Sequence, residues 1–290
     1  MKKSLVIIFS IILCIALAGA AVALGGECGI IKKDEPISSG ESEKENLSQK
    51  TDKNTESIVI EETETLSAED KALKAEIAKI SDTKVDFRVN KQDKIGGKTY
   101  NMTYKELGDA AILYTSTLDN GKEAKFTYNL KSGKLRQVVA LTDGYTKTEN
   151  SITLEQARKI AVNIAEQYCD ISVYPLVEEK ENMQFYQFIF SKKIGGYIAA
   201  EGIVVDLDFN GDIYILQVCL DVFENEDFII DENKLLVALE DKLNKEFPDR
   251  ENYTVDKQRI SVSEGKPVME YYVTINVGYP IPRIYTIPIE

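Results

Sequence analysis

The stretch "VVDLDFNGDIYIL", residues 204–216, reads either as a strand hairpin or as a metal-binding loop. Apolar side chains recur at every second position around Asn210-Gly211, and they are Val205, Leu207, Phe209, Ile213 and Ile215. A period of two is typical of strands, and Asn-Gly is the strongest two-residue signal for a hairpin turn. We therefore predict two antiparallel strands joined at Asn210-Gly211, with the aspartates of the first strand on its solvent face.

The same stretch also fits part of a calcium-binding loop. The oxygen-bearing side chains around Gly211 are Asp206, Asp208, Asn210 and Asp212. An EF-hand-type loop needs a bidentate glutamate at its twelfth position, where this chain has Gln217. Aspartates two apart in a strand share one face and do not wrap around an ion. The hairpin is favoured, with a weak surface calcium site as the alternative, and we assign no catalytic, cofactor-binding or metal-binding residue.

The composition excludes several classes of function. The chain has 290 residues with 48 acidic and 35 basic side chains, and its formal net charge is −13. Because this charge repels phosphate backbones, we exclude nucleic acid as a partner. The sequence contains no histidine, which removes Ser-His-Asp and Cys-His nucleophiles and imidazole-based zinc sites. Carboxylate pairs remain available for acid–base catalysis.

Residues 1–31 are predicted to form a single-pass membrane anchor. Leu5–Leu24 carries no charged side chain, and its length matches the roughly 20 apolar residues that span a bilayer as a helix. Lys2 and Lys3 precede it, so the C-terminal part is expected outside the cytoplasm. Ala21-Val22-Ala23 fits a signal-peptidase site, and a cleaved signal peptide on a secreted protein is the alternative.

Residues 32–65 are predicted to form a disordered linker. They carry many charges and abundant Ser, Asn and Thr, with no aromatic side chain. Such a segment buries too little apolar surface to offset the entropy lost on folding. A flexible chain of this length reaches on the order of 30 Å, so the folded part is expected to be tethered near the membrane.

The rest of the chain reads as three units, at 66–150, 151–227 and 228–290. In each unit a capped amphipathic helix precedes segments of period two, such as "FTYNL" at 126–130, which ends shortly before a glycine turn. The predicted fold class is α+β, built of repeated units in which one helix packs on an antiparallel sheet. The long strands after Gly196 and Pro267 are expected at sheet edges, where they could accept an extended peptide.

The three helices are expected from capping residues and apolar periodicity. The first begins at Ser67, with Asp70 as its capping-box partner. The second begins at Thr153 with Gln156 in the box, and the third begins near Asp231. The predicted apolar faces are Leu66, Leu73, Ile77 and Ile80; Leu154, Ala157, Ile160, Ala161, Ile164 and Tyr168; and Leu236, Leu239, Leu243 and Phe247.

Residues 151–220 resemble a known family of extracytoplasmic domains. The helix "ITLEQARKIAVNIAEQY" resembles that of PepSY-type domains, and "KKIGGYIAAEGIVVDLDFNGDIYIL" is similar to the strands of YcdB/YcdC-like repeats. The resemblance implies a PepSY- or cystatin-like helix on a sheet. It also implies a membrane-tethered or propeptide module that binds or restrains peptidases or other envelope proteins, and it implies no catalytic residues.

The cysteines leave one question open. Cys28 follows Glu27, and a charged residue in that place departs from the lipobox pattern of lipoproteins, so we do not expect lipidation. Cys169, at the end of the second helix, and Cys219, after the hairpin, could form a disulfide outside the cytoplasm or remain free thiols.

Two functions follow from these observations. The first is an extracytoplasmic, membrane-tethered, non-enzymatic module that binds an envelope protein or peptide. The second is an envelope hydrolase that uses carboxylates alone, which requires a cleft where two acids converge and where carboxyl pKa values are raised.

Overall fold

A computed structural model describes residues 66–220, 222–223 and 228–289. The membrane anchor predicted at 1–31 and the linker predicted at 32–65 lie outside these residues. In the described part of the chain, none of the helices combines the length and the apolar character needed to cross a bilayer.

The described residues contain three helices, α2 (Ala68–Ile77), α3 (Leu154–Ala165) and α4 (Glu232–Glu246), and all three predicted N-caps are confirmed. Thr153 and Gln156 form the full capping box that the sequence predicts at α3. At α2 only half of the box forms. Ser67 accepts a hydrogen bond from the Asp70 backbone N–H, but the Asp70 carboxylate accepts from Val89 N–H at 2.8 Å.

The predicted apolar face is right for α3, whereas for α4 it is right at Leu239 and Leu243 and wrong at Leu236. Ala157, Ala161 and Ile164 are buried on α3 as expected. On α4 the buried residues are Leu235, Leu239 and Leu243, at intervals of four, whereas Leu236 is 44% exposed. Positions four apart share a helix face, so Leu235, which the prediction leaves out, lies on the same buried face as Leu239.

Among the described residues, twelve strands form one sheet with the order β1-β2-β3-β4-β5-β9-β8-β10-β11-β12, and β6 and β7 branch from β8. Neighbouring strands are antiparallel apart from β8 and β10, which are parallel, so the sheet is mixed. The strands are β1 (Asn90–Ile95), β2 (Lys98–Leu107), β3 (Ala111–Thr117), β4 (Glu123–Asn129), β5 (Leu135–Ala140), β6 (Leu176–Glu181), β7 (Tyr186–Ile194), β8 (Tyr197–Leu207), β9 (Ile213–Cys219), β10 (Asn252–Ser263), β11 (Lys266–Asn276) and β12 (Pro280–Pro288).

The prediction of repeated, separate helix-on-sheet units is wrong. Strand β5 pairs with β9, which lies nearly eighty residues further along the chain, and β8 pairs with β10 at Ala199 and Ile260. Strands that would be the exposed edges of separate units pair with each other instead. This pairing satisfies their backbone hydrogen bonds and leaves fewer free edges.

The two predicted edge strands are also interior. The strand after Gly196 is β8, which lies between β9 and β7, and the strand that begins around Pro267 is β11, between β10 and β12. The edges among the described strands are β1, β6 and β12. Strand β12 carries prolines at 280, 282 and 288, which cannot donate a backbone hydrogen bond to an added strand.

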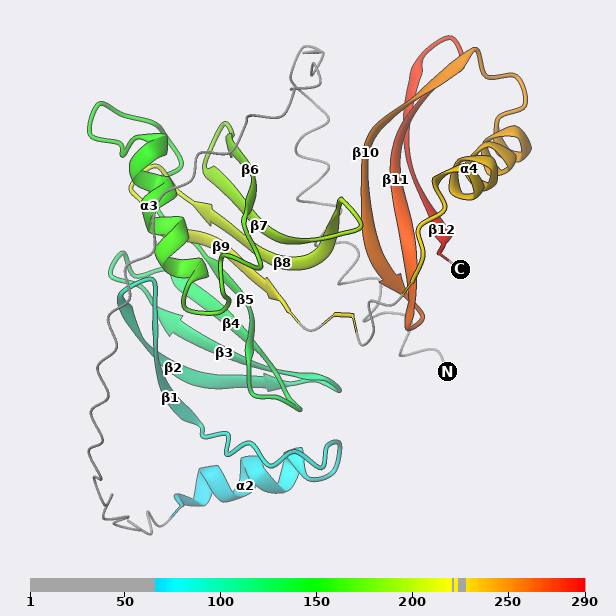
Figure 1. The fold of residues 1–290 in the computed structure, drawn as a ribbon. Coiled ribbons are helices and arrows are strands. Elements are labelled where there is room, and N and C mark those ends of the chain that lie inside the picture. The colour runs from blue at the N-terminus through cyan, green and yellow to red at the C-terminus, as the bar shows by residue number, and fades with distance from the viewer. Residues whose placement is uncertain (1–65, 221, 224–227, 290) are drawn as a thin grey trace, which may run out of the picture. The chain divides into compact units, whose positions relative to one another are not determined.

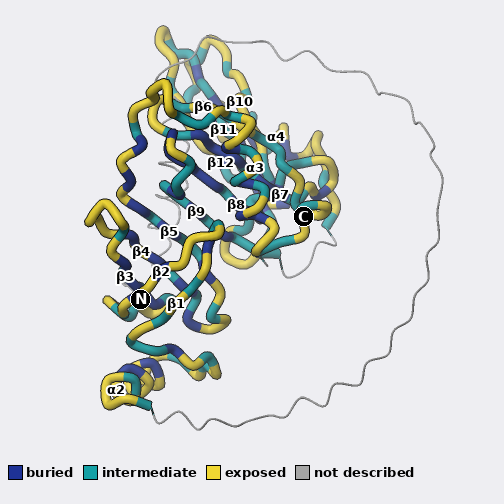
Figure 2. The backbone as a smooth tube through the Cα atoms, turned by 90° about the vertical axis from the view of Figure 1, so that its left-hand side faces the viewer, coloured by how far each residue is buried: buried dark blue, intermediate teal, exposed yellow. Residues whose placement is uncertain are grey.

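The apolar residues form two cores on the sheet (Figures 1 and 2). The first lies under α3, which packs on β7 and β8, and it extends along β2 to β5. The second lies under α4, which packs on β12. Helix α2 is mostly exposed and contributes Leu73 and Ile77 to the first core (Figure 2).

The hairpin predicted at 204–216 is confirmed. Strands β8 and β9 pair in the antiparallel sense, and Gly211 in the turn has a φ of 88°, which favours glycine. The solvent exposure predicted for the aspartates is wrong, because Asp206 is 3% exposed and Asp208 is fully buried. The face of β8 opposite the first core is itself covered around Asp206, where Gln187 of β7 donates a hydrogen bond to the carboxylate.

Candidate binding groove

A groove of about 730 Å³ opens where β2, β3 and β4 approach the tip of the β8–β9 hairpin. Ligand pockets in proteins typically measure roughly 300–1,000 Å³. Its lining comes from four separate segments, which are residues 98–103, 115–123, 140–143 and 210–213. The sheet order brings them together, because β5 pairs with β9 and thereby places the loop after β5 beside the hairpin tip.

Small and hydroxyl-bearing side chains line the inner part of the groove. Ser116, Ala140 and Thr142 are buried and lie on strands or strand extensions that alternate in burial. Thr142 continues the alternation of β5, so it is on the same face as Ala140. Tyr100, also buried, contacts Phe126 with ring centroids 5.0 Å apart. The hollow exists because these side chains, apart from the tyrosine, are small.

The rim of the groove is acidic. Its charged lining residues are four carboxylates and one lysine: Asp119, Glu123, Asp143, Asp212 and Lys98. Lys98 forms an ion pair with Asp212 across the mouth, joining the start of β2 to the hairpin. Asp119 and Glu123 are exposed at the turn between β3 and β4.

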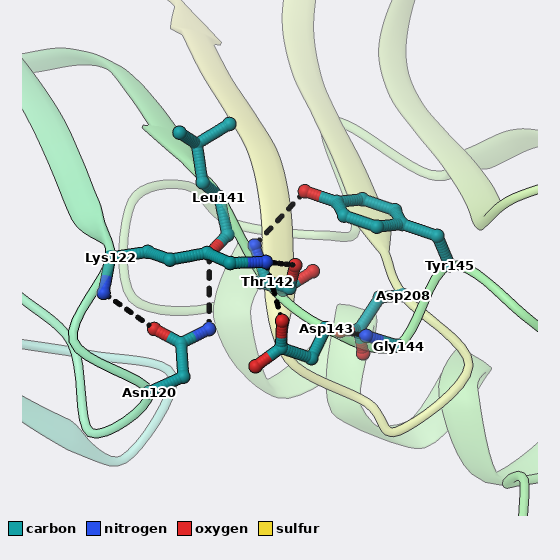
Figure 3. A network of polar contacts seen from close by, with 8 residues as sticks. All are labelled: Asn120, Lys122, Leu141, Thr142, Asp143, Gly144, Tyr145 and Asp208. Atoms are coloured by element: carbon teal, nitrogen blue, oxygen red, sulfur yellow. Dashed lines mark hydrogen bonds and ion pairs between the residues drawn. The ribbon is translucent and has the colours of Figure 1, made fainter.

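One wall of the groove is the loop 141–145, which the β3–β4 turn holds by side-chain contacts (Figure 3). Asn120 donates from Nδ2 to the Leu141 carbonyl at 3.2 Å. Lys122 donates from Nζ to the Thr142 carbonyl at 3.3 Å and forms an ion pair with Asp143. The hydrogen bonds from Lys122 and Asn120 lower the pKa of the Asp143 carboxyl, which keeps it ionised.

The β8–β9 hairpin holds the other side of this loop through Asp208. Its carboxylate accepts hydrogen bonds from the backbone N–H groups of Gly144 at 3.1 Å, Asn210 at 2.9 Å and Asp212 at 2.9 Å. The Phe209 N–H in turn donates to the Gly144 carbonyl at 2.9 Å. A Cβ atom at position 144 would come within 2.4 Å of Asp208 Oδ2, so this close approach requires glycine.

The Thr142 hydroxyl has no hydrogen-bond partner among the described residues, although the side chain is only 4% exposed. Its backbone is well bonded, since the Thr142 N–H donates to the Tyr145 hydroxyl at 3.0 Å. A buried hydroxyl without a partner costs free energy, and such groups occur where a ligand or an ordered water completes the bonding.

The field in the groove is negative around Tyr100. Burial, followed by the nearby carboxylates of Asp212 and Asp119, raises the pKa of the Tyr100 phenol to about 12. These two aspartates come from different elements that line the groove, one from the hairpin and one from the β3–β4 turn. Their negative potentials therefore overlap in its interior.

Asp206 differs from the carboxylates of the groove. Burial raises its pKa to about 7, and the hydrogen bond from Gln187, at 3.0 Å, only partly opposes this effect. Asp206 is not among the residues that line the groove, although the neighbouring hairpin residues Asn210 and Asp212 are.

The residues of the calcium alternative thus have separate roles. Asp206 bonds Gln187, Asp208 bonds backbone N–H groups, and Asp212 pairs with Lys98. In the described part of the chain, no three His, Cys, Asp or Glu side chains are grouped so that they could hold a metal ion. Cys169 and Cys219 are free thiols in the structure.

The groove itself was not predicted from the sequence. Its residues are scattered over more than a hundred positions, and each short segment resembles an ordinary polar turn. The signal available was the density of Asp, Asn and Thr at the strand ends "TSTLDNGKE" (115–123) and "ALTDG" (140–144). Only the pairing of β5 with β9 shows that these segments face the hairpin.

Comparisons with known proteins add little to this geometry. No family model matches the sequence, and no curated protein matches it. Among solved structures, the chain is similar to the Bacillus megaterium YpeB C-terminal domain, with 13% sequence identity and a TM-score of 0.37. The match covers 75% of this chain and 97% of that chain. At these values it assigns neither a fold nor a function, and the PepSY-type likeness of residues 151–220 remains a resemblance.

Proposed function

We propose that this chain is an extracytoplasmic, membrane-tethered module that binds a protein or peptide without catalysing a reaction, and that the groove beside the hairpin is its binding site. The groove is the observation that carries the proposal, because a hollow of about 730 Å³ with a charged rim is of ligand-binding size. The resemblance at 151–220 suggests the class of partner, a peptidase or another envelope protein.

The carboxyl groups support binding over turnover. A carboxylate hydrolase needs one acid with a raised pKa beside a second, ionised acid in a cleft. In the groove the pKa of Asp143 is lowered by its bonds to Lys122 and Asn120, which makes it a poor proton donor. Asp206 has the raised pKa but is 3% exposed and does not line the groove.

Tethering would raise the effective concentration of the groove near membrane-bound partners. The apolar segment Leu5–Leu24 and the charged stretch 32–65 motivate this part of the proposal. If a signal peptidase removes the apolar segment, the same domain would act as a secreted protein.

Site-specific photo-crosslinking in membranes tests the proposal. A photoreactive amino acid at Thr117, on the groove, is compared with one at Asp109, in the turn at the opposite end of β3. We expect a discrete crosslinked protein from position 117 and none from 109, and the purified, identified partner should bind the full chain. Hydrolysis of a peptide, ester or glycan by the full chain, lost on changing Glu123→Gln or Asp143→Asn, would overturn the proposal in favour of the hydrolase.

A further inference from the structure

We infer that the groove recognises a lysine or arginine side chain presented by an extended, basic segment of its partner. This inference rests on the proposed function and specifies the chemistry of the ligand. Three independent features of the groove carry it, namely the charge of its rim, a buried hydroxyl without a partner and the shape of its interior.

The rim has more negative charge than its internal ion pairs neutralise. Lys98 pairs with Asp212, and Lys122 pairs with Asp143. Asp119 and Glu123 remain as two further carboxylates at the same mouth. Both belong to the exposed turn between β3 and β4, where they can approach a cation without reorganising the fold. A cationic side chain placed between them would make charge-assisted hydrogen bonds to both.

The missing partner of the Thr142 hydroxyl indicates a ligand that supplies a hydrogen-bonding group. The side chain of Thr142 is 4% exposed, lies on the same face of the β5 extension as Ala140, and has no partner within the described residues. The carboxylates of the rim are hydrogen-bond acceptors, and the Thr142 hydroxyl can also accept a hydrogen bond. A ligand group with several N–H donors could therefore bond to both. Guanidinium and ammonium groups carry several N–H donors and no acceptor.

The interior suits the aliphatic stem of such a side chain. Ala140 and the buried, aromatic Tyr100 both line the groove. Lysine and arginine stems pack along apolar surface while their charged ends reach polar groups. The carboxylates of Asp119 and Asp212 both act on the Tyr100 phenol, so a cation in this space would lie in an attractive field.

Fluorescence anisotropy with two labelled peptides tests the inference. The probes are fluorescein-labelled twelve-residue peptides of the repeats Gly-Arg-Ser and Gly-Glu-Ser, titrated with the full chain. We expect binding of the arginine peptide that weakens as salt rises, and none of the glutamate peptide. Because a chain of net charge −13 attracts any cation, the variants decide whether the groove is responsible.

Two charge-matched double variants provide the decisive comparison. Asp119→Asn with Glu123→Gln should lower the affinity for the arginine peptide about tenfold, since the variant removes two charge-assisted contacts to the cation. Glu106→Gln with Asp109→Asn makes the same charge change at exposed positions outside the groove and should change it less than twofold. Equal losses in both variants, or no loss in the first, would overturn the inference.

Thr142→Val provides a second test of the groove, because it leaves the charge of the protein unchanged. The change removes the hydroxyl at nearly constant volume, so we expect weaker binding of the arginine peptide with no loss of thermal stability. Unchanged binding would overturn the role of Thr142. A crosslinked partner that still binds the Asp119→Asn, Glu123→Gln variant would refute the basic-segment inference while leaving the proposed function intact. A chain that captures no partner at all would refute the proposed function.

Discussion

Asp208, at the tip of the β8–β9 hairpin, and Asp206, in strand β8, are both buried but differ in the hydrogen bonds that their carboxylates accept. Asp208 at the tip is fully buried, and its carboxylate accepts three backbone N–H groups. Asp206 in β8 is 3% exposed, and the hydrogen bond to its carboxylate comes from the Gln187 amide. Burial raises the pKa of Asp206 to about 7. The difference teaches that the number of donors, and not burial alone, decides whether a buried carboxylate stabilises a fold.

Removing the well-bonded carboxylate should have the largest effect. Asp208→Ala leaves the N–H groups of Gly144, Asn210 and Asp212 without their acceptor. We expect the free energy of unfolding to fall by about 5 kcal/mol, because each lost bond to a charged group contributes about 1.5–3 kcal/mol. Urea denaturation of the full chain measures it. Asp208→Asn, which keeps one acceptor oxygen, is the control and should lose less than half as much.

Titration of Asp206, whose carboxylate has few hydrogen bonds, should have the next largest effect on stability. Removing this carboxylate should stabilise the protein at neutral pH, whereas removing that of Asp208 destabilises it. The folded pKa of Asp206, about 7, lies above the ordinary 3.8, so the folded state holds a proton that the unfolded chain releases. The protein should therefore lose stability as the pH rises from 4 to 7, by roughly 3–4 kcal/mol relative to Asp206→Asn. Denaturation midpoints of both proteins from pH 4 to 8 measure this, and parallel curves would show that Asp206 titrates normally.

The close approach at Gly144 should have an intermediate effect. Gly144→Ala puts a Cβ atom at 2.4 Å from Asp208 Oδ2, so the loop or the carboxylate must move. We expect a loss of about 2 kcal/mol, in the range of overpacked sites. The loss should shrink when Asp208→Ala is already present, because the two changes disrupt one contact. Additive losses in this double-mutant cycle would contradict the coupling.

The ion pair on the groove wall should have the smallest effect. Lys122→Met removes the exposed pair with Asp143 and the bond to the Thr142 carbonyl. Exposed ion pairs contribute little to stability, so the denaturation midpoint should move little. Release of the loop should instead appear as faster amide exchange at Thr142 and Gly144. Unchanged exchange there would mean that the other bonds of the loop, such as those of Asp208 and Asn120, fix it without Lys122.

The local elements were predictable because their signals are local. The capping box of Thr153 and Gln156 and the Asn210-Gly211 hairpin each depend on residues within a few positions. Periodicity also identified the residues that share a face, as with Val205 and Leu207 on β8. It could not tell that the opposite face around Asp206 is covered as well, since that depends on β7 and β9.

Neither the joining of the three units into one sheet nor the groove was predictable from the sequence. Both depend on strand pairs that are far apart along the chain. Val138 pairs with Leu216, and Ala199 pairs with Ile260, yet nothing in either segment specifies its partner. An apolar strand is compatible with any neighbour that has a matching face. For the same reason, carboxylates at Asp119 and Asp212 read as solvated turn residues until the sheet order places both beside Tyr100.

The junction between β8 and β10 has a mechanical consequence. In the described strands these two share the single registered pair Ala199–Ile260, whereas β10 and β11 are paired along nearly their whole length. A pulling force transmitted across the sheet therefore meets few backbone hydrogen bonds here. The junction also holds through Ile194 and Ala199, which pack into the second core, and through the ion pair of Lys257 with Glu178. Strands β10 to β12 and helix α4 should therefore separate together from the rest of the sheet at low force, while the first core stays folded.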